Sequence, residues 1–101
     1  MSRKRSASHW LEPDPSWHPE VREFFSRVAA HWDLAQRPDA VALLRTACDA
    51  KNRALEAEAL LRKEGLVLRT AKGTTRLHPA AKIARENAAL FVSALREMGL
   101  E

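Results

Sequence analysis

Side chains that could bind a polyanion are concentrated in two stretches of this 101-residue chain. The stretches are residues 2–5 and 65–85, and neither contains Asp or Glu; their basic residues are Arg3, Lys4, Arg5, Arg69, Lys72, Arg76, Lys82 and Arg85. Together they carry +8, whereas the whole chain carries +4, so the remainder carries −4. Such clustering of Lys and Arg is typical of proteins that bind nucleic acids. The pattern predicts a polyanionic partner, and solvated surface charge is the alternative.

Other kinds of chemistry have little support in the sequence. A P-loop ends in Gly-Lys-Ser/Thr, whose backbone amides enclose phosphate, but Lys72-Gly73-Thr74 has the order reversed. The histidines and Cys48 lack the close spacing of zinc ligand pairs. Cys48 lies on an apolar helical stripe, which favours a small core residue over a nucleophile. We therefore expect no enzyme, no catalytic residue, no metal, no cofactor and no small-molecule substrate.

The first fifteen residues are predicted to form a flexible basic arm, and residues 16–101 a single helical domain. Ser, Pro and charged residues dominate the arm, and Pro13-Asp14-Pro15 prevents regular structure locally. Trp10 and Leu11 are candidates to anchor it. The arm lacks the apolar stretch of a signal peptide, and no apolar run reaches the roughly 20 residues that span a bilayer. The sequence thus predicts a cytoplasmic protein without membrane contact.

Apolar periodicity predicts three helices and a mainly α fold. The first helix should start near Ser16–Pro19 and end before Arg37-Pro38, with an apolar stripe of Val21, Phe24, Phe25, Val28 and Trp32. The second should run from Pro38-Asp39 to Glu64 and stop at Gly65. It carries two apolar stripes, which would let it contact two neighbours at once.

The third helix should open at His78-Pro79 and close at Gly99. Its predicted buried face consists of Ile83, Leu90, Phe91, Ala94, Leu95 and Met98. Between the second and third helices, residues 66–70 and 74–77 favour β structure, and Gly73 can supply the positive φ of a tight turn. A short β-hairpin is therefore predicted there, with an extended loop as the alternative. We expect His78 to cap or pack the third helix.

From about Trp17 onward, the order of these features resembles the small terminase subunits of tailed bacteriophages. A Pro- and Trp-containing lead precedes a helix that ends in a tryptophan, at Pro13, Pro15, Trp17 and Trp32. A second helix starts on Asp, carries a Cys and stops at Lys-Glu-Gly, at Asp39, Cys48 and Lys63-Glu64-Gly65. His78-Pro79 then opens a last helix that ends in Leu95-x-x-x-Gly99-Leu100. The family usually continues with a Pro- and Arg-containing tail, whereas this chain stops at Glu101.

The resemblance implies a non-catalytic adaptor that forms a ring, binds double-stranded viral DNA and recruits a large subunit with ATPase and nuclease activity. The cations of both basic stretches would then contact DNA phosphates, which position a protein without reading bases. Two alternatives remain. One is a dimeric DNA-binding regulator with a wing-like hairpin, and the other is a helical protein-interaction module.

Overall fold

The structure of this protein is a computed structural model, and it describes residues 11–99. The elements along the chain are α2 (Pro19–His31), the 3₁₀ turn η2 (Leu34–Gln36), α3 (Pro38–Glu64), β1 (Val67–Arg69), β2 (Thr75–Leu77) and α4 (Pro79–Met98). Three helices and an antiparallel hairpin between the second and third confirm the predicted mainly α fold. The hairpin, rather than an extended loop, joins α3 to α4.

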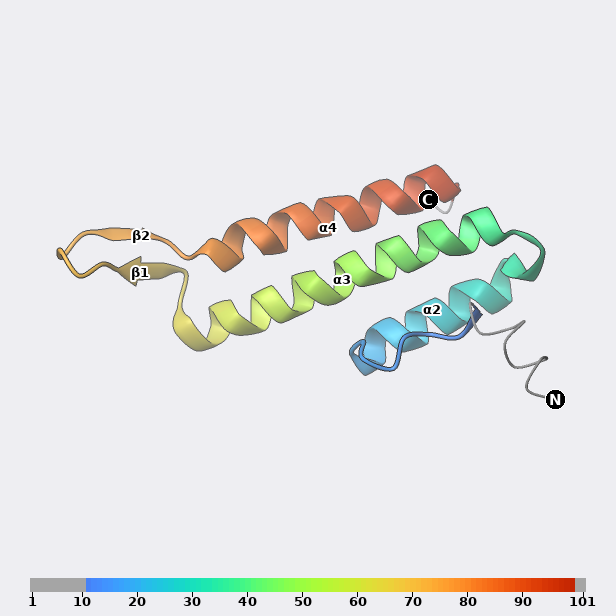
Figure 1. The fold of residues 1–101 in the computed structure, drawn as a ribbon, viewed down its shortest axis with the longest axis horizontal. Coiled ribbons are helices and arrows are strands. Elements are labelled where there is room, and N and C mark those ends of the chain that lie inside the picture. The colour runs from blue at the N-terminus through green and yellow to red at the C-terminus, as the bar shows by residue number, and fades with distance from the viewer. Residues whose placement is uncertain (1–10, 100–101) are drawn as a thin grey trace.

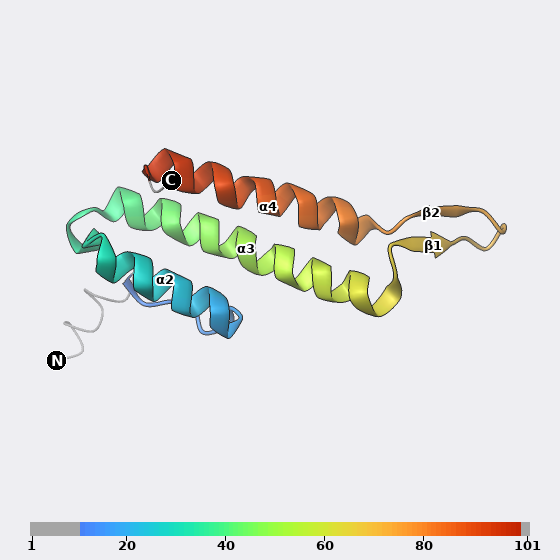
Figure 2. The same ribbon diagram turned by 180° about the vertical axis from the view of Figure 1, so that it is seen from behind.

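The three helices lie side by side in a single layer with α3 in the middle (Figure 1). Figure 2 shows the same arrangement from behind, so neither broad face of the layer is covered by another element of the described chain. Helix α2 packs beside the first half of α3, while the hairpin projects beyond α3 and α4 at the other end. The molecule therefore has a three-helix end and a two-helix end.

Prolines set the starts of all three helices, as the sequence predicts. Pro19, Pro38 and Pro79 each occupy the first turn, where a missing N–H costs nothing. Gly65 follows α3 with a φ of 87°, and its N–H donates to the Leu61 carbonyl oxygen at 2.7 Å. The predicted bounds of α3 are therefore confirmed at both ends.

The end of the first helix differs from the prediction. Helix α2 stops at His31, and Asp33 then adopts a left-handed conformation with a φ of 50° that turns the chain into η2. Trp32 consequently falls outside the helix and is 50% exposed, so its predicted place in the buried stripe is wrong. Its ring packs edge-on against His31, with centroids 5.2 Å apart.

The predicted buried face of the last helix is also partly wrong. Ile83 and Leu90 are 46% and 43% exposed, whereas Ala80, Ala84, Ala94 and Met98 are buried. Small residues allow α4 to approach α3 closely, and this turns Ile83 and Leu90 toward the broad face of the layer. Asn87 lies on the same helix, and its side-chain amide donates to the Ile83 carbonyl oxygen at 2.9 Å.

Two separate clusters form the buried interior. The larger lies at the three-helix end and is formed by Trp17, Val21, Phe25, Leu34, Ala40, Val41, Leu44, Cys48 and Met98. The smaller lies between α3 and α4 and consists of Ala57, Ala80 and Ala84, with Leu61 packed against them. The second helix thus uses its two stripes on two neighbours, as predicted.

Polar contacts fix the chain before α2 onto α3. The Trp17 indole N–H donates to Asp49 Oδ1 at 2.8 Å, and the His18 N–H donates to Asn52 Oδ1 at 2.8 Å. Leu11 packs against the larger cluster, and the Arg45 guanidinium donates to the Glu12 carbonyl oxygen. Residues 1–10 of the predicted arm, which include Trp10, lie outside the described residues.

Candidate nucleic-acid interface

The basic hairpin is attached to the helices by a short hydrogen-bonded stem. Val67 pairs with Leu77, Leu68 with Arg76 and Arg69 with Thr75. Below these pairs, the His78 N–H donates to the Leu66 carbonyl oxygen at 2.7 Å. The hairpin is therefore connected to the end of α3 at Gly65 and to the start of α4 at His78.

His78 joins the two helices at the base of this stem. Its Nδ1 accepts the Ala80 N–H at 3.0 Å, which caps α4, and its Nε2 lies 2.8 Å from Glu64 Oε1 at the end of α3. Because Nδ1 is an acceptor, the neutral ring carries its proton on Nε2 and donates to the carboxylate. His78 is buried, so the expectation of a capping or packing role is confirmed.

A compact turn closes the far end of the hairpin. The Gly73 N–H donates to the Thr70 carbonyl oxygen at 3.0 Å, and Gly73 has a φ of 85°, which a residue with a side chain rarely adopts. The Thr70 N–H donates to the Thr74 carbonyl oxygen at 2.7 Å, and the two hydroxyl oxygens lie 2.6 Å apart. Lys72 therefore sits at the tip, and it is exposed.

The strand register places Arg69 and Arg76 on opposite faces of the hairpin. Residues paired directly across two strands share a face, and successive residues alternate between faces. One face therefore carries Val67, Arg69, Thr75 and Leu77, and the other carries Leu68, Thr70, Thr74 and Arg76. Both arginines are exposed. The predicted hairpin cations thus surround the hairpin instead of forming one flat patch.

The two predicted cations on the last helix lie just after the hairpin. Lys82 and Arg85 are exposed, and they point away from the buried Ala80 and Ala84 on the side that packs against α3. Lys82 Nζ lies 3.8 Å from Glu86 Oε2, with both side chains well exposed. Such an exposed ion pair is weak, so it leaves Lys82 available to other anions.

Positive charge at this end of the molecule is largely unopposed. Among residues 11–99, Lys82 is the one predicted DNA-binding residue that forms an ion pair with a carboxylate. Arg3, Lys4 and Arg5, which were predicted to contribute an arm, lie outside the described residues. The described hairpin and the first turns of α4 therefore form the candidate interface, defined by Arg69, Lys72, Arg76, Lys82 and Arg85.

Exposed apolar side chains beside this interface were not predicted from the sequence. Val67 and Leu77 pair across the base of the hairpin and are both exposed, as is Leu66 before them. On α3 and α4, Leu60 and Ile83 line one shallow depression together with Arg53 and Glu56. The sequence does contain a signal for these exposed side chains, because several Leu and Val residues lie in and beside a hairpin that is too short to bury them.

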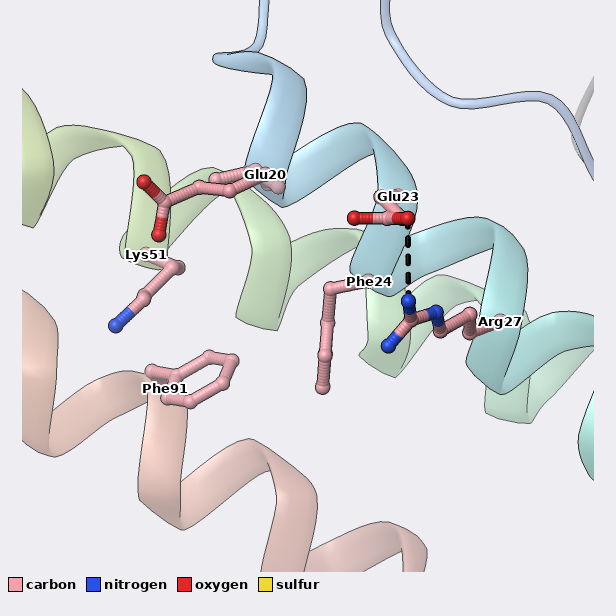
Figure 3. Close-up of a pocket in the computed structure, with 7 residues that line it drawn as sticks. Glu20, Glu23, Phe24, Arg27, Lys51 and Phe91 are labelled. Atoms are coloured by element: carbon pink, nitrogen blue, oxygen red, sulfur yellow. Dashed lines mark hydrogen bonds and ion pairs between the residues drawn. The ribbon is translucent and has the colours of Figure 1, made fainter.

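A second depression lies between α2 and α4 at the three-helix end (Figure 3). Its floor contains Phe24 and Phe91, with ring centroids 5.6 Å apart, and Lys51 Nζ lies 5.4 Å from the Phe91 ring centre. Glu20 and Glu23 stand at its rim, and Glu23 pairs with Arg27 at 3.2 Å. The two carboxylates offset the two cations Arg27 and Lys51, so this depression has no excess of positive charge that would attract phosphate.

The described part of the chain gives no support to a metal centre or a reactive thiol. No group of three or more His, Cys, Asp or Glu side chains within residues 11–99 is arranged to hold a metal ion. Cys48 is buried, and burial raises the pKa of its thiol to about 12. None of the described helices is long and apolar enough to cross a membrane.

The fold and the candidate interface define the class of this protein: it is a small helical protein with a projecting basic hairpin. Residues 22–101 match the family model for the phage terminase small subunit. The match covers most of the chain, so this protein belongs to the phage terminase small-subunit family. No curated protein and no solved structure gives a significant match. Membership of this family, whose members are generally non-catalytic, supports a role in packaging viral DNA.

Proposed function

We propose that this protein is a non-enzymatic adaptor of genome packaging in the host cytoplasm. It binds double-stranded viral DNA through the candidate interface, assembles into a ring of identical subunits and brings the DNA to the large terminase subunit, which holds the ATPase and nuclease. The observation that carries the proposal is the projecting hairpin, whose exposed Arg69, Lys72 and Arg76 have no carboxylate partner among residues 11–99.

Electrostatics support the DNA-binding part of the proposal. Cations that neutralise phosphates release condensed counterions, and the affinity then falls as salt rises. The candidate interface has five cations, while the rest of the chain, apart from residues 2–5, has a net negative charge. Within the described residues, duplex DNA is therefore attracted mainly to the end that carries the hairpin. In a ring, weak contacts from several subunits add up to a higher avidity.

The flat shape supports assembly. A single layer of helices leaves both broad faces uncovered, and Leu60, Ile83 and Leu90 are 39%, 46% and 43% exposed. Ile83 and Leu90 are seven residues apart on α4, so they lie on one side of that helix, and Ile83 shares a depression with Leu60 on α3. A second copy of the chain would remove this apolar surface from water, which is favourable.

DNA binding is tested by replacing Arg69, Lys72 and Arg76 with Ala and measuring the affinity for duplex DNA between low and moderate salt. We expect weaker binding and a salt slope reduced by about 0.9 for each lost phosphate contact. The matched control replaces Arg27, Arg37 and Arg96, which are also exposed, and removes the same charge. An unchanged slope in the hairpin variant, or an equal loss in the control, would contradict the assignment.

Assembly is tested with a pair of substitutions on α4. Ile83 and Val92 are both 46% exposed, but nine residues separate them, which places them on opposite sides of the helix. We expect Ile83→Glu to reduce the assembly to smaller species in light scattering and Val92→Glu to leave it intact. Dissociation by Val92→Glu alone would place the interface on the other side of α4. A wild-type monomer would refute ring formation.

A further inference from the structure

The geometry of the hairpin points to a specific way of engaging DNA. We infer that the hairpin enters the major groove of the duplex as a two-stranded ribbon, with Arg69 and Arg76 contacting phosphates on opposite sides of the groove. This inference rests on the proposed function, because it takes duplex DNA as the partner. It adds which groove is occupied and how the two arginines divide the contacts.

The first argument comes from the two faces of the ribbon. A cation pair that binds one flat phosphate surface lies on a single face, but the register places Arg69 and Arg76 on opposite faces. When a ribbon lies inside a groove, each of its faces is directed toward one of the two phosphate backbones that form the walls. The observed division of charge suits this arrangement and does not suit binding by one face alone.

The second argument comes from size. A sheet with its side chains is about 10 Å thick, which is the spacing at which sheets stack, and the major groove of B-DNA, about 12 Å wide, admits a two-stranded ribbon. The minor groove is only about 6 Å wide, so side chains on both faces of a ribbon would not fit there without deforming the DNA. Contact with the major groove therefore requires no distortion of either molecule.

The third argument comes from the tip. The turn consists of Ala71, Lys72 and Gly73, so its one long side chain is a lysine. Thr70 and Thr74 behind it hold each other through their hydroxyl groups, which makes the tip narrow and polar. Such a tip can approach the floor of the groove, where base edges present hydrogen-bond acceptors to Lys72. The apolar pair Val67 and Leu77 lies at the base of the hairpin, away from the tip.

A duplex with a filled major groove tests the inference without knowledge of the recognised sequence. In such DNA every cytosine is replaced by glucosylated 5-hydroxymethylcytosine, whose sugar projects from C5 into the major groove and leaves the phosphates and the minor groove unchanged. We expect the full-length protein to bind this duplex about tenfold more weakly than the unmodified duplex of the same sequence. Equal affinities would overturn the groove assignment and leave the proposed DNA binding intact. Absence of binding to both duplexes at low salt would overturn both.

Single substitutions test the division of contacts. We expect Arg69→Ala and Arg76→Ala each to lower the salt slope by about 0.9 for every subunit that contacts DNA, and the double variant to lose the sum. Arg96→Ala, an exposed cation at the far end of α4, is the control and should leave the slope unchanged. A loss confined to one of the two hairpin arginines would overturn the inference, because one face would then suffice. So would a change in assembly size without a change in DNA affinity, which would assign the hairpin to a neighbouring subunit.

Discussion

The two ends of this molecule bury very different side chains. At the three-helix end, Phe25, Leu34 and Leu44 are at most 1% exposed and pack around Trp17. At the two-helix end, the buried cluster contains only alanines, and Leu60, Val67, Leu77 and Ile83 remain exposed. The stability of the folded subunit therefore depends mainly on the first end, whereas the surfaces proposed to bind DNA and other subunits belong to the second.

This difference explains why the functional surfaces lie where they do. A long α3 of 27 residues extends about 40 Å, and its second half continues well past the start of α2. The part that extends past α2 carries the hairpin away from the core, where it can reach a large partner without disturbing the packing. Apolar surface left uncovered at that end is stabilised once a partner covers it.

The largest effect that separates the two ends should come from Phe25→Ala. Phe25 is 0% exposed, and its ring packs against Trp17 with centroids 5.5 Å apart, so its removal leaves a cavity. We expect the free energy of unfolding to fall by about 3–5 kcal/mol, as measured by urea denaturation. In contrast, Val92→Ala on the exposed side of α4 should change it by about 0.5 kcal/mol or less. Similar losses in the two variants would show that the subunit has no dominant core.

The same contrast explains what could be predicted from the sequence. Helix boundaries depend on local chemistry, so Pro38, Gly65 and Pro79 were sufficient to place them. Which face of α4 is buried depends on the neighbour, and periodicity favours the largest apolar residues. Ala80 and Ala84 face α3 instead, because their small side chains let the two helices approach closely. The helical position predicted for Trp32 was wrong for a related reason. The turn at Asp33 ends α2 at His31, whereas the apolar stripe in the sequence continues to Trp32.

The candidate interface, too, could be predicted from the sequence only in part. Its cations lie close together in the sequence, so counting charges along the chain was enough to identify them. Their arrangement around the hairpin depends on the register, which a shift of one residue would reverse. The strands predicted at 66–70 and 74–77 are compatible with the pairing of Arg69 with Thr75, but Gly73 alone does not exclude a shift by one residue. Opposite faces for the two arginines therefore emerged only from the folded structure.

A smaller effect should come from the joint that connects the two-helix end to the hairpin. His78→Ala removes the side chain that caps α4 and the hydrogen bond to Glu64, and we expect a loss of about 1 kcal/mol in unfolding free energy. His78→Asn keeps an acceptor for the Ala80 N–H, so it should recover part of this loss. Amide exchange should become faster in the hairpin first, because the stem starts at His78. Faster exchange in α2 instead would contradict the assignment of His78 to a local joint.

At neutral pH the smallest effect is expected from the Cys48 thiol, because its contribution to the pH dependence appears only at high pH. Burial raises the pKa of this thiol from 9.0 to about 12, so the folded protein keeps it neutral under conditions where the unfolded chain ionises it. The unfolded state then holds fewer protons than the folded state, and stability must fall as pH rises above 9. Below that pH the thiol is protonated in both states and contributes no pH dependence. Urea denaturation between about pH 8 and pH 10.5 (a range of about 2.5 units that includes the free thiol pKa) should show a steeper decline for the wild type than for Cys48→Ala. Equal declines would mean that water reaches Cys48 in the folded protein. The interior of the three-helix end would then be less well shielded than the burial of Phe25 and Leu44 implies.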